Sequence, residues 1–289
     1  MFDDILVPTD GSENAERALE HATLLASAYD ATVHGLYVLN VTYAADFEGG
    51  VDSESVMTAL EQEGETALET VEDHCGTQEV AVTTALLEGR PAHRISSYAD
   101  EHDVDLVVMG THGRSGVSRL LLGSVTESVI RQSQRPVLTV PTDAPPIEDR
   151  YSDLLVATDG SDDAIHATET AVDIATQFDA TIHGLYVVDV AFTRNQLVEE
   201  SLTRSGERAL ADLEETVEGT GLATVTEVCP GSPHEEIGAY ATNHDIDLIV
   251  LGSHGKGAFE RTFLGSVSER SIRTADRPIL VTRRPVESE

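Results

Sequence analysis

The chain contains one glycine pattern twice, and this repetition restricts its fold more than any other feature. The first copy is Gly110-Thr-His-Gly113, nine residues, then Gly123-Ser124-Val125, and the second is Gly252-Ser-His-Gly255, nine residues, then Gly265-Ser266-Val267. Each copy follows an apolar run rich in β-branched residues, which indicates a buried parallel strand. Each copy also leads into a segment with helical character. Each pattern therefore connects the C-terminal end of a strand to the N-terminus of a helix.

The segments after the two patterns predict where these helices begin. Ser124 and Ser266 are good N-cap residues, and Glu127 and Glu269 follow three residues later, as in a capping box. A helix N-terminus offers unbonded N–H groups to an anion, and a glycine lets the backbone approach a phosphate without a Cβ in the way. We interpret each pattern as a phosphate-binding loop. The alternative is a glycine-rich surface loop with no ligand.

The rest of the chain repeats as well. The segment 3–12, which contains Asp10, returns as 153–161 with Asp159, and the strand-like segment 31–38 returns as 180–187. Apolar residues at helical spacing follow both aspartates. The further expected elements are helices over 53–75, ended by Gly76, and over about 195–218; strands over 79–87 and 222–228; helices from Pro91 to about 101 and from Pro233 to about 243; and terminal strands over 136–140 and 278–282.

This alternation predicts an α/β fold class. Each half is expected to form a five-stranded parallel sheet with helices on both faces and right-handed crossovers. If the strand order is 3-2-1-4-5, the switch point lies between the first and fourth strands. Asp10 would then lie beside the Gly110 loop and Asp159 beside the Gly252 loop, so that two distant signals meet in one crevice.

The length indicates two domains, because 289 residues correspond to two at roughly 150 residues each. The segment from Pro141 to Arg150 is rich in proline and polar residues, which is typical of a linker. We expect a first domain over 1–141, a linker over 142–150 and a second domain over 151–289.

The charge excludes several classes of partner. The net charge is −34, with 52 acidic and 18 basic residues, and this opposes binding to nucleic acid or to an anionic membrane. Acidic surfaces with almost no lysine are typical of halophilic proteins, and the alternative is an acidic protein from an ordinary cell. No apolar run of about 18 residues and no signal peptide occur, so a cytoplasmic location is expected.

Most basic residues nevertheless gather around the two glycine patterns, where an anion would meet the least repulsion. They are Arg114, Arg119, Arg131 and Arg135 in the first half and Lys256, Arg261, Arg270, Arg273, Arg277, Arg283 and Arg284 in the second.

Other polar residues are interpreted as structural. Cys75 and Cys229 support neither a disulfide framework nor a thiolate metal site. His34 and His183 lack a second ligand at a metal-site spacing and are expected to be core histidines with hydrogen-bond partners. The aspartates of 102–105 and 244–247 lie before a strand, opposite the ligand end, and are interpreted as turn and cap residues.

Two of these motifs carry a family resemblance. With Val-Pro-Thr-Asp10-Gly-Ser12 and Gly110-x2-Gly113-x9-Gly123-Ser124, each half resembles a domain of the ATP-binding branch of the universal stress proteins. The resemblance implies tandem flavodoxin-like, adenine-nucleotide-hydrolase-like domains that pair within the chain through their terminal strands, with further homodimerisation as an open alternative. One departure is Ala157, which stands where the first half has Pro8.

The resemblance also implies the site residues and the ligand. Asp10 and Val38 would hold the adenine end of ATP, with or without Mg²⁺, while the glycine patterns would line the ribose and the phosphates. The implied residues are Asp10, Val38, Gly110, Gly113, Gly123, Ser124 and Val125 in the first half and Asp159, Val187, Gly252, Gly255, Gly265, Ser266 and Val267 in the second.

The residues favour binding over catalysis. No Walker A lysine or G-x-S-x-G nucleophile motif occurs. We expect an ATP-binding regulatory or stress-response protein. The alternatives are a slow ATPase or phosphotransferase, or an interaction module with vestigial sites. His112 and His254 are the repeated candidates for a general base, but no carboxylate is evidently placed to orient them, so we expect them to shape the turn.

Overall fold

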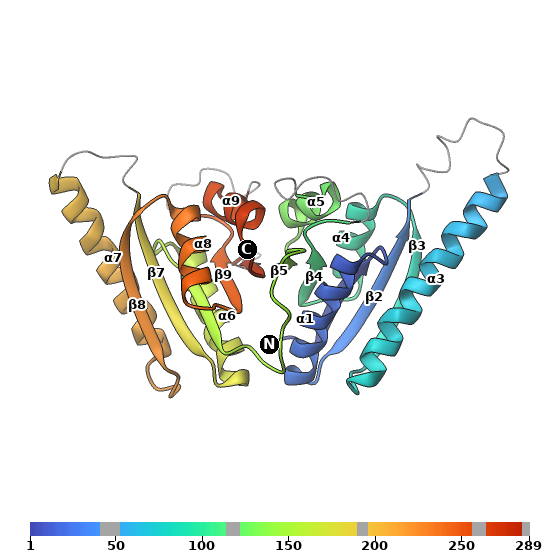
Figure 1. The fold of residues 1–289 in the computed structure, drawn as a ribbon, viewed down its shortest axis with the longest axis horizontal. Helices are drawn as coiled ribbons and strands as arrows, with labels where there is room; N and C mark the ends of the chain where they lie inside the picture. The colour runs from blue at the N-terminus through green and yellow to red at the C-terminus, as the bar shows by residue number, and fades with distance from the viewer. Residues whose placement is uncertain (41–52, 114–121, 190–195, 256–263, 285–289) are drawn as a thin grey trace, which may run out of the picture. The chain divides into compact units, whose positions relative to one another are not determined.

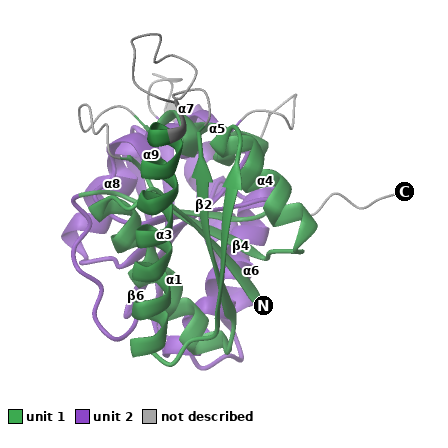
Figure 2. Ribbon diagram, turned by 90° about the vertical axis from the view of Figure 1, so that its right-hand side faces the viewer, with its two compact units in different colours: residues 1–142 green, residues 143–289 purple. Residues whose placement is uncertain are grey.

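The computed structural model describes residues 1–40, 53–113, 122–189, 196–255 and 264–284. Four basic residues expected near the loops, Arg114, Arg119, Lys256 and Arg261, lie outside the described residues, as does the segment 41–52, expected to be irregular. The chain divides into two compact units, Met1–Thr142 and Asp143–Glu289 (Figure 2).

Both units are α/β, as the sequence predicts, and within the described residues each contains five strands and four helices in alternation (Figure 1). The first unit consists of β1 (Asp4–Thr9), α1 (Glu13–Tyr29), β2 (Thr32–Leu39), α3 (Ser53–Thr77), β3 (Val82–Glu88), α4 (Pro91–Glu101), β4 (Leu106–Gly110), α5 (Ser124–Gln132) and β5 (Val137–Val140). The second consists of β6 (Asp153–Ala157), α6 (Asp162–Phe178), β7 (Thr181–Asp189), α7 (Gln196–Val217), β8 (Thr224–Gly231), α8 (Pro233–Asn243), β9 (Leu248–Gly252), α9 (Ser266–Thr274) and β10 (Ile279–Thr282).

All strand pairs within each unit are parallel. In the first unit they run in the order β3-β2-β1-β4-β5, and in the second in the order β8-β7-β6-β9-β10. Helix α1 contacts α3, and α4 contacts α5, so that both faces of the first sheet are covered. This double cover explains why the central strands are continuously apolar: Ile5, Leu6 and Val7 of β1 are all fully buried.

The two central strand pairs differ in length. The pairing of β1 with β4 includes Ile5 and Leu6 only, whereas β6 pairs with β9 from Leu154 to Ala157. Pro8 stands in β1 where β6 has Ala157, and a proline has no N–H to donate to a strand ladder. The departure noted in the sequence therefore coincides with a shorter ladder at the C-terminal end of β1.

The sequence locates most helix ends. Ser12 caps α1, where its Oγ accepts the N–H of Ala15 at 3.3 Å, and Asp30 ends the helix in the left-handed conformation with a φ of 56°. Pro91 and Pro233 begin α4 and α8, as expected.

The expected end of α3 at Gly76 is wrong. The helix continues to Thr77, and the residue with positive φ is Glu79, at 57°. Nothing lies within 4 Å of a Cβ built on Gly76, so this glycine neither ends the helix nor permits a close contact. The reversal falls later, and β3 begins at Val82 rather than at residue 79.

The aspartates before β4 and β9 act as turn residues, as interpreted. The Oδ2 of Asp105 accepts the N–H groups of Asp3 and Asp4 at 2.8 and 3.1 Å, and Asp103 adopts a φ of 50°. In the second unit Asp247 accepts the corresponding N–H groups of Ser152 and Asp153 at 2.6 and 3.1 Å. These carboxylates fasten the start of the central strand to the start of its neighbour.

His34 is a core histidine with partners on both ring nitrogens, as the sequence indicates. Its Nδ1 lies 3.1 Å from the hydroxyl of Tyr98 and its Nε2 lies 2.8 Å from Asp4 Oδ1. His183 makes the equivalent contacts in the second unit. Burial raises the pKa of the Cys75 thiol to about 11, as expected for a packing residue. Among the helices of the described segments, none is long and apolar enough to cross a membrane.

Candidate functional site

The candidate site lies where β1 and β4 end side by side at the carboxyl edge of the sheet. Their chains continue in opposite directions, into α1 and towards α5, and such a divergence opens a crevice. Asp10 follows β1, Gly110 ends β4, and Val38 lies near the end of β2, half-buried and opposite Leu87. In the second unit Asp159, Gly252 and Val187 hold the same positions.

The turn after β1 is held by its own side chains. Asp10 Oδ1 accepts the N–H of Ser12, and Thr9 Oγ1 accepts the N–H of Gly11, both at 3.1 Å. Gly11 has a φ of 69°, a conformation that favours glycine. The turn at Asp159 has the same bonds, at 3.0 and 3.1 Å. These bonds fix the direction of the aspartate.

This turn brings Asp10 to the glycine loop. A Cβ added to Gly113 would touch the Oδ2 of Asp10, and a Cβ on Gly255 would lie 2.6 Å from the Oδ2 of Asp159. Both loop glycines have ordinary negative φ, since neither is among the described residues with positive φ. Lack of space, rather than backbone conformation, therefore requires glycine at these positions.

The first glycine of each pattern also serves packing. A Cβ on Gly252 would lie 2.7 Å from the backbone carbon of Asp163, and one on Gly110 would lie 2.5 Å from Asn14 Nδ2. Asn14 and Asp163 belong to the first turns of α1 and α6. These two glycines let the end of the strand lie directly against the helix N-terminus.

The expected capping box is wrong in both units. Gly123 and Gly265 are the N-caps, and Ser124 and Ser266 are the first helical residues. The N–H of Gly123 donates to Thr111 O at 2.8 Å, and this tertiary bond fixes the helix start one residue before the serine. Neither N-cap glycine carries a side chain that could bond the first turn.

The first turns of α5 and α9 therefore offer N–H groups. Glu127 N–H donates to Gly123 O at 2.8 Å, but within the described residues the N–H groups of Ser124, Val125 and Thr126 meet no acceptor. The corresponding groups in α9 are those of Ser266, Val267 and Ser268. Three adjacent donors at the positive end of a helix dipole form a typical anion site.

Two hydroxyl groups that no sequence motif pointed to hold these helix starts in place. Thr126 Oγ1 donates to Gly110 O at 2.9 Å, and Ser268 Oγ donates to Gly252 O at 2.8 Å. Both repeats have a hydroxyl residue at the same position of the helix, and this agreement is the sequence feature that could have pointed to the two bonds. The bonds connect the donor turn to the end of the neighbouring strand.

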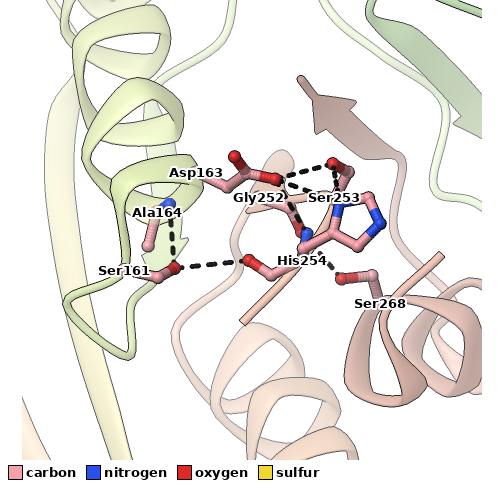
Figure 3. A network of polar contacts seen from close by, with 7 residues as sticks. All are labelled: Ser161, Asp163, Ala164, Gly252, Ser253, His254 and Ser268. Carbon is pink, nitrogen blue, oxygen red and sulfur yellow. Dashed lines mark hydrogen bonds and ion pairs between the residues drawn. The ribbon is translucent and has the colours of Figure 1, made fainter. Parts of the chain in front are cut away.

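The expectation that no carboxylate orients the loop histidines is wrong for the second unit. His254 Nδ1 lies 3.2 Å from Asp163 Oδ2, as Figure 3 shows. In the first unit the corresponding helical residue is Asn14, whose Nδ2 donates to His112 O at 3.0 Å. A comparison of the two repeats reveals that Asp163 stands where the first unit has Asn14. The contact with His254 could be found only from the fold, because the two residues are 91 positions apart in the sequence.

Arginine contributes less to the site than the sequence suggests. Arg131 lies 3.0 Å from Glu127, Arg273 lies 3.2 Å from Glu269, and Arg284 lies 3.0 Å from Asp162. Burial lowers the pKa of Arg283, and the charge of Asp163 opposes that shift. Because acidic neighbours offset these arginines, backbone donors are the stronger attraction for an anion in the described part of the site.

Tyr186 is a further residue near the site that the sequence did not single out. It is buried, and its ring lies where a Cβ on Gly206 of α7 would be 2.5 Å from Cδ1. Burial raises the pKa of its hydroxyl, and the charge of Asp159 raises it further.

A cavity of about 290 Å³ lies between α1 and α3 and borders the Asp10 turn. Its lining includes Thr9 and Gly11 of that turn, together with Leu19 and Glu63, but none of the described glycine-loop residues. The cavity therefore adjoins the candidate site on the side of Asp10 and not on the side of the glycine loop.

The comparisons with known proteins agree with this architecture. The sequence model of the universal stress protein family matches residues 1–141 and 150–283. The chain belongs to the universal stress protein family. A relative within the family, universal stress protein MJ0531 of Methanocaldococcus jannaschii, is 38% identical over 140 residues, which cover 48% of this chain and 82% of the relative.

Two solved structures of family members also resemble the chain. A universal stress protein from Archaeoglobus fulgidus has a TM-score of 0.74 at 23% identity and covers 99% of this chain and 98% of its own, which shows a common fold. A universal stress protein in complex with cAMP is 26% identical, with a TM-score of 0.38, and covers 48% of this chain and 97% of its own. The bound cAMP is a property of that protein.

Proposed function

We propose that each unit binds one adenine nucleotide, ATP, at the carboxyl edge of its sheet, and that the protein has a regulatory or stress-response role. The observation that carries this proposal is the group of three N–H donors at the start of α5 and again at the start of α9, each preceded by a glycine N-cap. Phosphate oxygens are the natural partners of such donors.

The other site residues fit the rest of the nucleotide. Asp10 and Asp159 are fixed beside the loops, and a carboxylate accepts hydrogen bonds from amino or hydroxyl groups. Val38 and Val187 offer apolar surface for the base. Mg²⁺ is usually bound through substrate phosphates together with one or two carboxylates, so it would accompany the phosphates of ATP.

Slow hydrolysis in the second unit is the competing proposal, and the Asp163–His254 contact favours it. The Nε2 of His254 is buried, however, and makes no hydrogen bond within the described residues, so its access to an attacking water is poor. We therefore favour retention of ATP over turnover. Measurement of ADP release from the purified protein separates the two proposals.

Calorimetric titration with ATP tests the proposal. We expect two nucleotides bound per chain, and mass spectrometry of ligand released from the purified protein should identify the adenine nucleotide. A stoichiometry of one would mean that one unit has a vestigial site. No binding of ATP, ADP or AMP would refute the assignment.

We also propose several features of the whole molecule. They are domain limits at 1–141 and 151–289 with a linker between them, pairing of the two halves through the terminal strands, further homodimerisation, a cytoplasmic location and a halophilic source.

A further inference from the structure

We infer that Asp163 is a positioning residue that makes the second nucleotide site different from the first. It holds the segment Ser253–His254 at the start of the second glycine loop and fixes the tautomer of His254. The part of the inference that concerns nucleotide affinity rests on the proposed function, whereas the part that concerns the loop does not.

One carboxylate oxygen of Asp163 accepts three hydrogen bonds from the loop (Figure 3). Its Oδ2 lies 2.8 Å from Ser253 Oγ, 3.1 Å from the backbone N of His254 and 3.2 Å from His254 Nδ1. The side chain of Asp163 is 20% exposed and that of His254 is 12% exposed. Bonds to an ionised acceptor are about twice as strong as neutral ones, and partial burial limits their competition with water.

These contacts determine where the imidazole proton lies. Ser253 has a single hydroxyl proton and donates it to Asp163, so the Ser253 oxygen must act as acceptor towards His254 Nδ1, 2.8 Å away. The ionised carboxylate requires a donor at Nδ1 as well. Neutral His254 therefore carries its proton on Nδ1, and its Nε2 is an acceptor.

The backbone of His254 is held on both sides. Its N–H donates to Asp163, and its carbonyl oxygen accepts from Ser161 Oγ at 3.3 Å. Ser161 is also the N-cap of α6, where its Oγ accepts the N–H of Ala164 at 3.3 Å. The start of the second loop is therefore fastened to the first turn of α6.

The first unit lacks this attachment. Asn14 donates from Nδ2 to His112 O at 3.0 Å, but its Oδ1 is buried and meets no donor within the described residues. Among the described residues the one hydrogen-bond partner of His112 Nδ1 is the Thr111 hydroxyl, at 2.9 Å, and either group can be the donor in that pair. In the first unit a single hydrogen bond from the neutral Asn14 side chain thus stands in place of the three hydrogen bonds that the Asp163 carboxylate accepts in the second.

Charge alone does not account for the difference between the sites. Asp163 adds a negative charge that would repel phosphates, but Arg283 lies close enough to interact with it. In the first unit the residue that follows the last strand is Pro141 rather than arginine. The pairs Asp163 with Arg283 and Asn14 with Pro141 carry the same formal net charge, so at these positions the two units differ in the hydrogen bonds that hold the start of the loop rather than in net charge.

A loop held in place before binding loses less conformational freedom when the ligand arrives, and affinity rises accordingly. We therefore expect the second site to bind ATP about tenfold more tightly than the first, and removal of the Asp163 carboxylate to abolish that difference.

The first test needs no nucleotide. In wild-type protein the amide of His254 should exchange with solvent at least tenfold more slowly than that of His112, and the ¹⁵N shifts of the His254 ring should report a proton on Nδ1. Asp163→Asn should remove both features. The substitution copies the residue present in the first unit, so the fold should persist, and thermal melting checks this.

Asp162→Asn is the matched control. It removes the same charge from the same helix turn, but Asp162 contacts Arg284 at the surface and not the loop. It should leave the exchange rate and the ring shifts unchanged. Equal protection of His112 and His254 in wild type, or an unchanged His254 signature in Asp163→Asn, overturns the inference.

The second test is calorimetry with ATP. Wild type should give two affinities separated by about tenfold, Asp163→Asn should give one affinity for both sites, and Asp162→Asn should resemble wild type. Two equal sites in wild type would overturn the affinity part while leaving the proposed function intact. Absence of ATP binding would refute the proposed function, and the exchange experiment would still decide the role of Asp163 in the loop.

Discussion

At the scale of single residues, the glycines of the candidate site meet two different physical requirements. Gly11 is required by its φ of 69°, whereas a Cβ on Gly113 would have no room beside Asp10. The two glycines look the same in the sequence, so their positions could be predicted but the reasons for them could not. The contact of Asp163 with His254 could not be predicted either, because it joins the first turn of α6 to a loop 91 residues later in the sequence. The positions of Asp10 and His34 were predictable, because they follow from the strands β1 and β2.

His21 provides a residue-scale prediction of pH dependence. It is 2% exposed in α1, and burial lowers its pKa to about 4 from 6.5. In the unfolded chain the imidazole binds a proton at a higher pH than in the folded protein. The stability associated with neutral His21 is therefore fully present above about pH 6.5 and is lost as the pH falls towards 4, by on the order of 3 kcal/mol.

We expect His21→Thr to remove this part of the pH dependence. The second unit has Thr170 at the corresponding position, equally buried, with its hydroxyl bonded to His166 O at 2.9 Å. Urea unfolding at pH 7 and pH 4.5 should show a smaller loss of stability in the variant than in wild type. The control is His93→Thr, at an exposed position, which should retain the wild-type loss. Equal losses in His21→Thr and wild type would contradict the prediction.

At the scale of elements, the sequence identified the strands and helices and misplaced some of their ends. Ser124 has the higher intrinsic preference for an N-cap, but Gly123 takes that position because its N–H bonds to Thr111 O. Gly76 suggested a helix end in the same way, and α3 continues past it. Residue preferences for helix ends located each helix boundary to within a few residues, and tertiary contacts determined the exact residue.

The N-cap glycine leads to an element-scale prediction. An aspartate at position 123 would accept the N–H groups of Val125 or Thr126, as N-cap carboxylates do, and would occupy the donors proposed to bind phosphate. Gly123→Asp should therefore leave the melting temperature within a few degrees of wild type and abolish ATP binding at the first site, so that calorimetry gives one nucleotide per chain.

Gly123→Ala controls for the added Cβ. That Cβ would lie 3.1 Å from Thr111 O, a tight contact that both variants share, and the φ of −58° suits any residue. The alanine variant should retain measurable first-site binding. Two nucleotides bound with unchanged affinity in Gly123→Asp would exclude the α5 N-terminus as the phosphate site.

At the scale of the whole molecule, the repeat and the alternation of strands and helices were enough to predict two α/β halves, because period and order are sequence properties. The surface charge is equally visible in the sequence, and the structure adds how it is arranged. On α3, Glu61, Glu65, Glu69 and Asp73 are all exposed and lie four residues apart. Like charges at this spacing face one another on a helix and destabilise it.

The net charge of −34 therefore predicts that stability depends on salt. Added salt shortens the Debye length from roughly 10 Å at 0.1 M to about 3 Å at 1 M, and this screens the repulsion between exposed carboxylates. The melting temperature should rise between 0.1 and 1 M KCl and level off as screening saturates. At equal ionic strength K₂SO₄ should add only the further effect of sulfate exclusion from the surface.

Glu65→Gln combined with Glu69→Gln interrupts the row of carboxylates on α3, so this variant should melt at a higher temperature than wild type at 0.1 M KCl and respond less to added salt. If the melting temperature of wild type is the same at 0.1 and 1 M KCl, self-repulsion does not limit the stability of this protein, and the proposal of a halophilic source loses its physical basis.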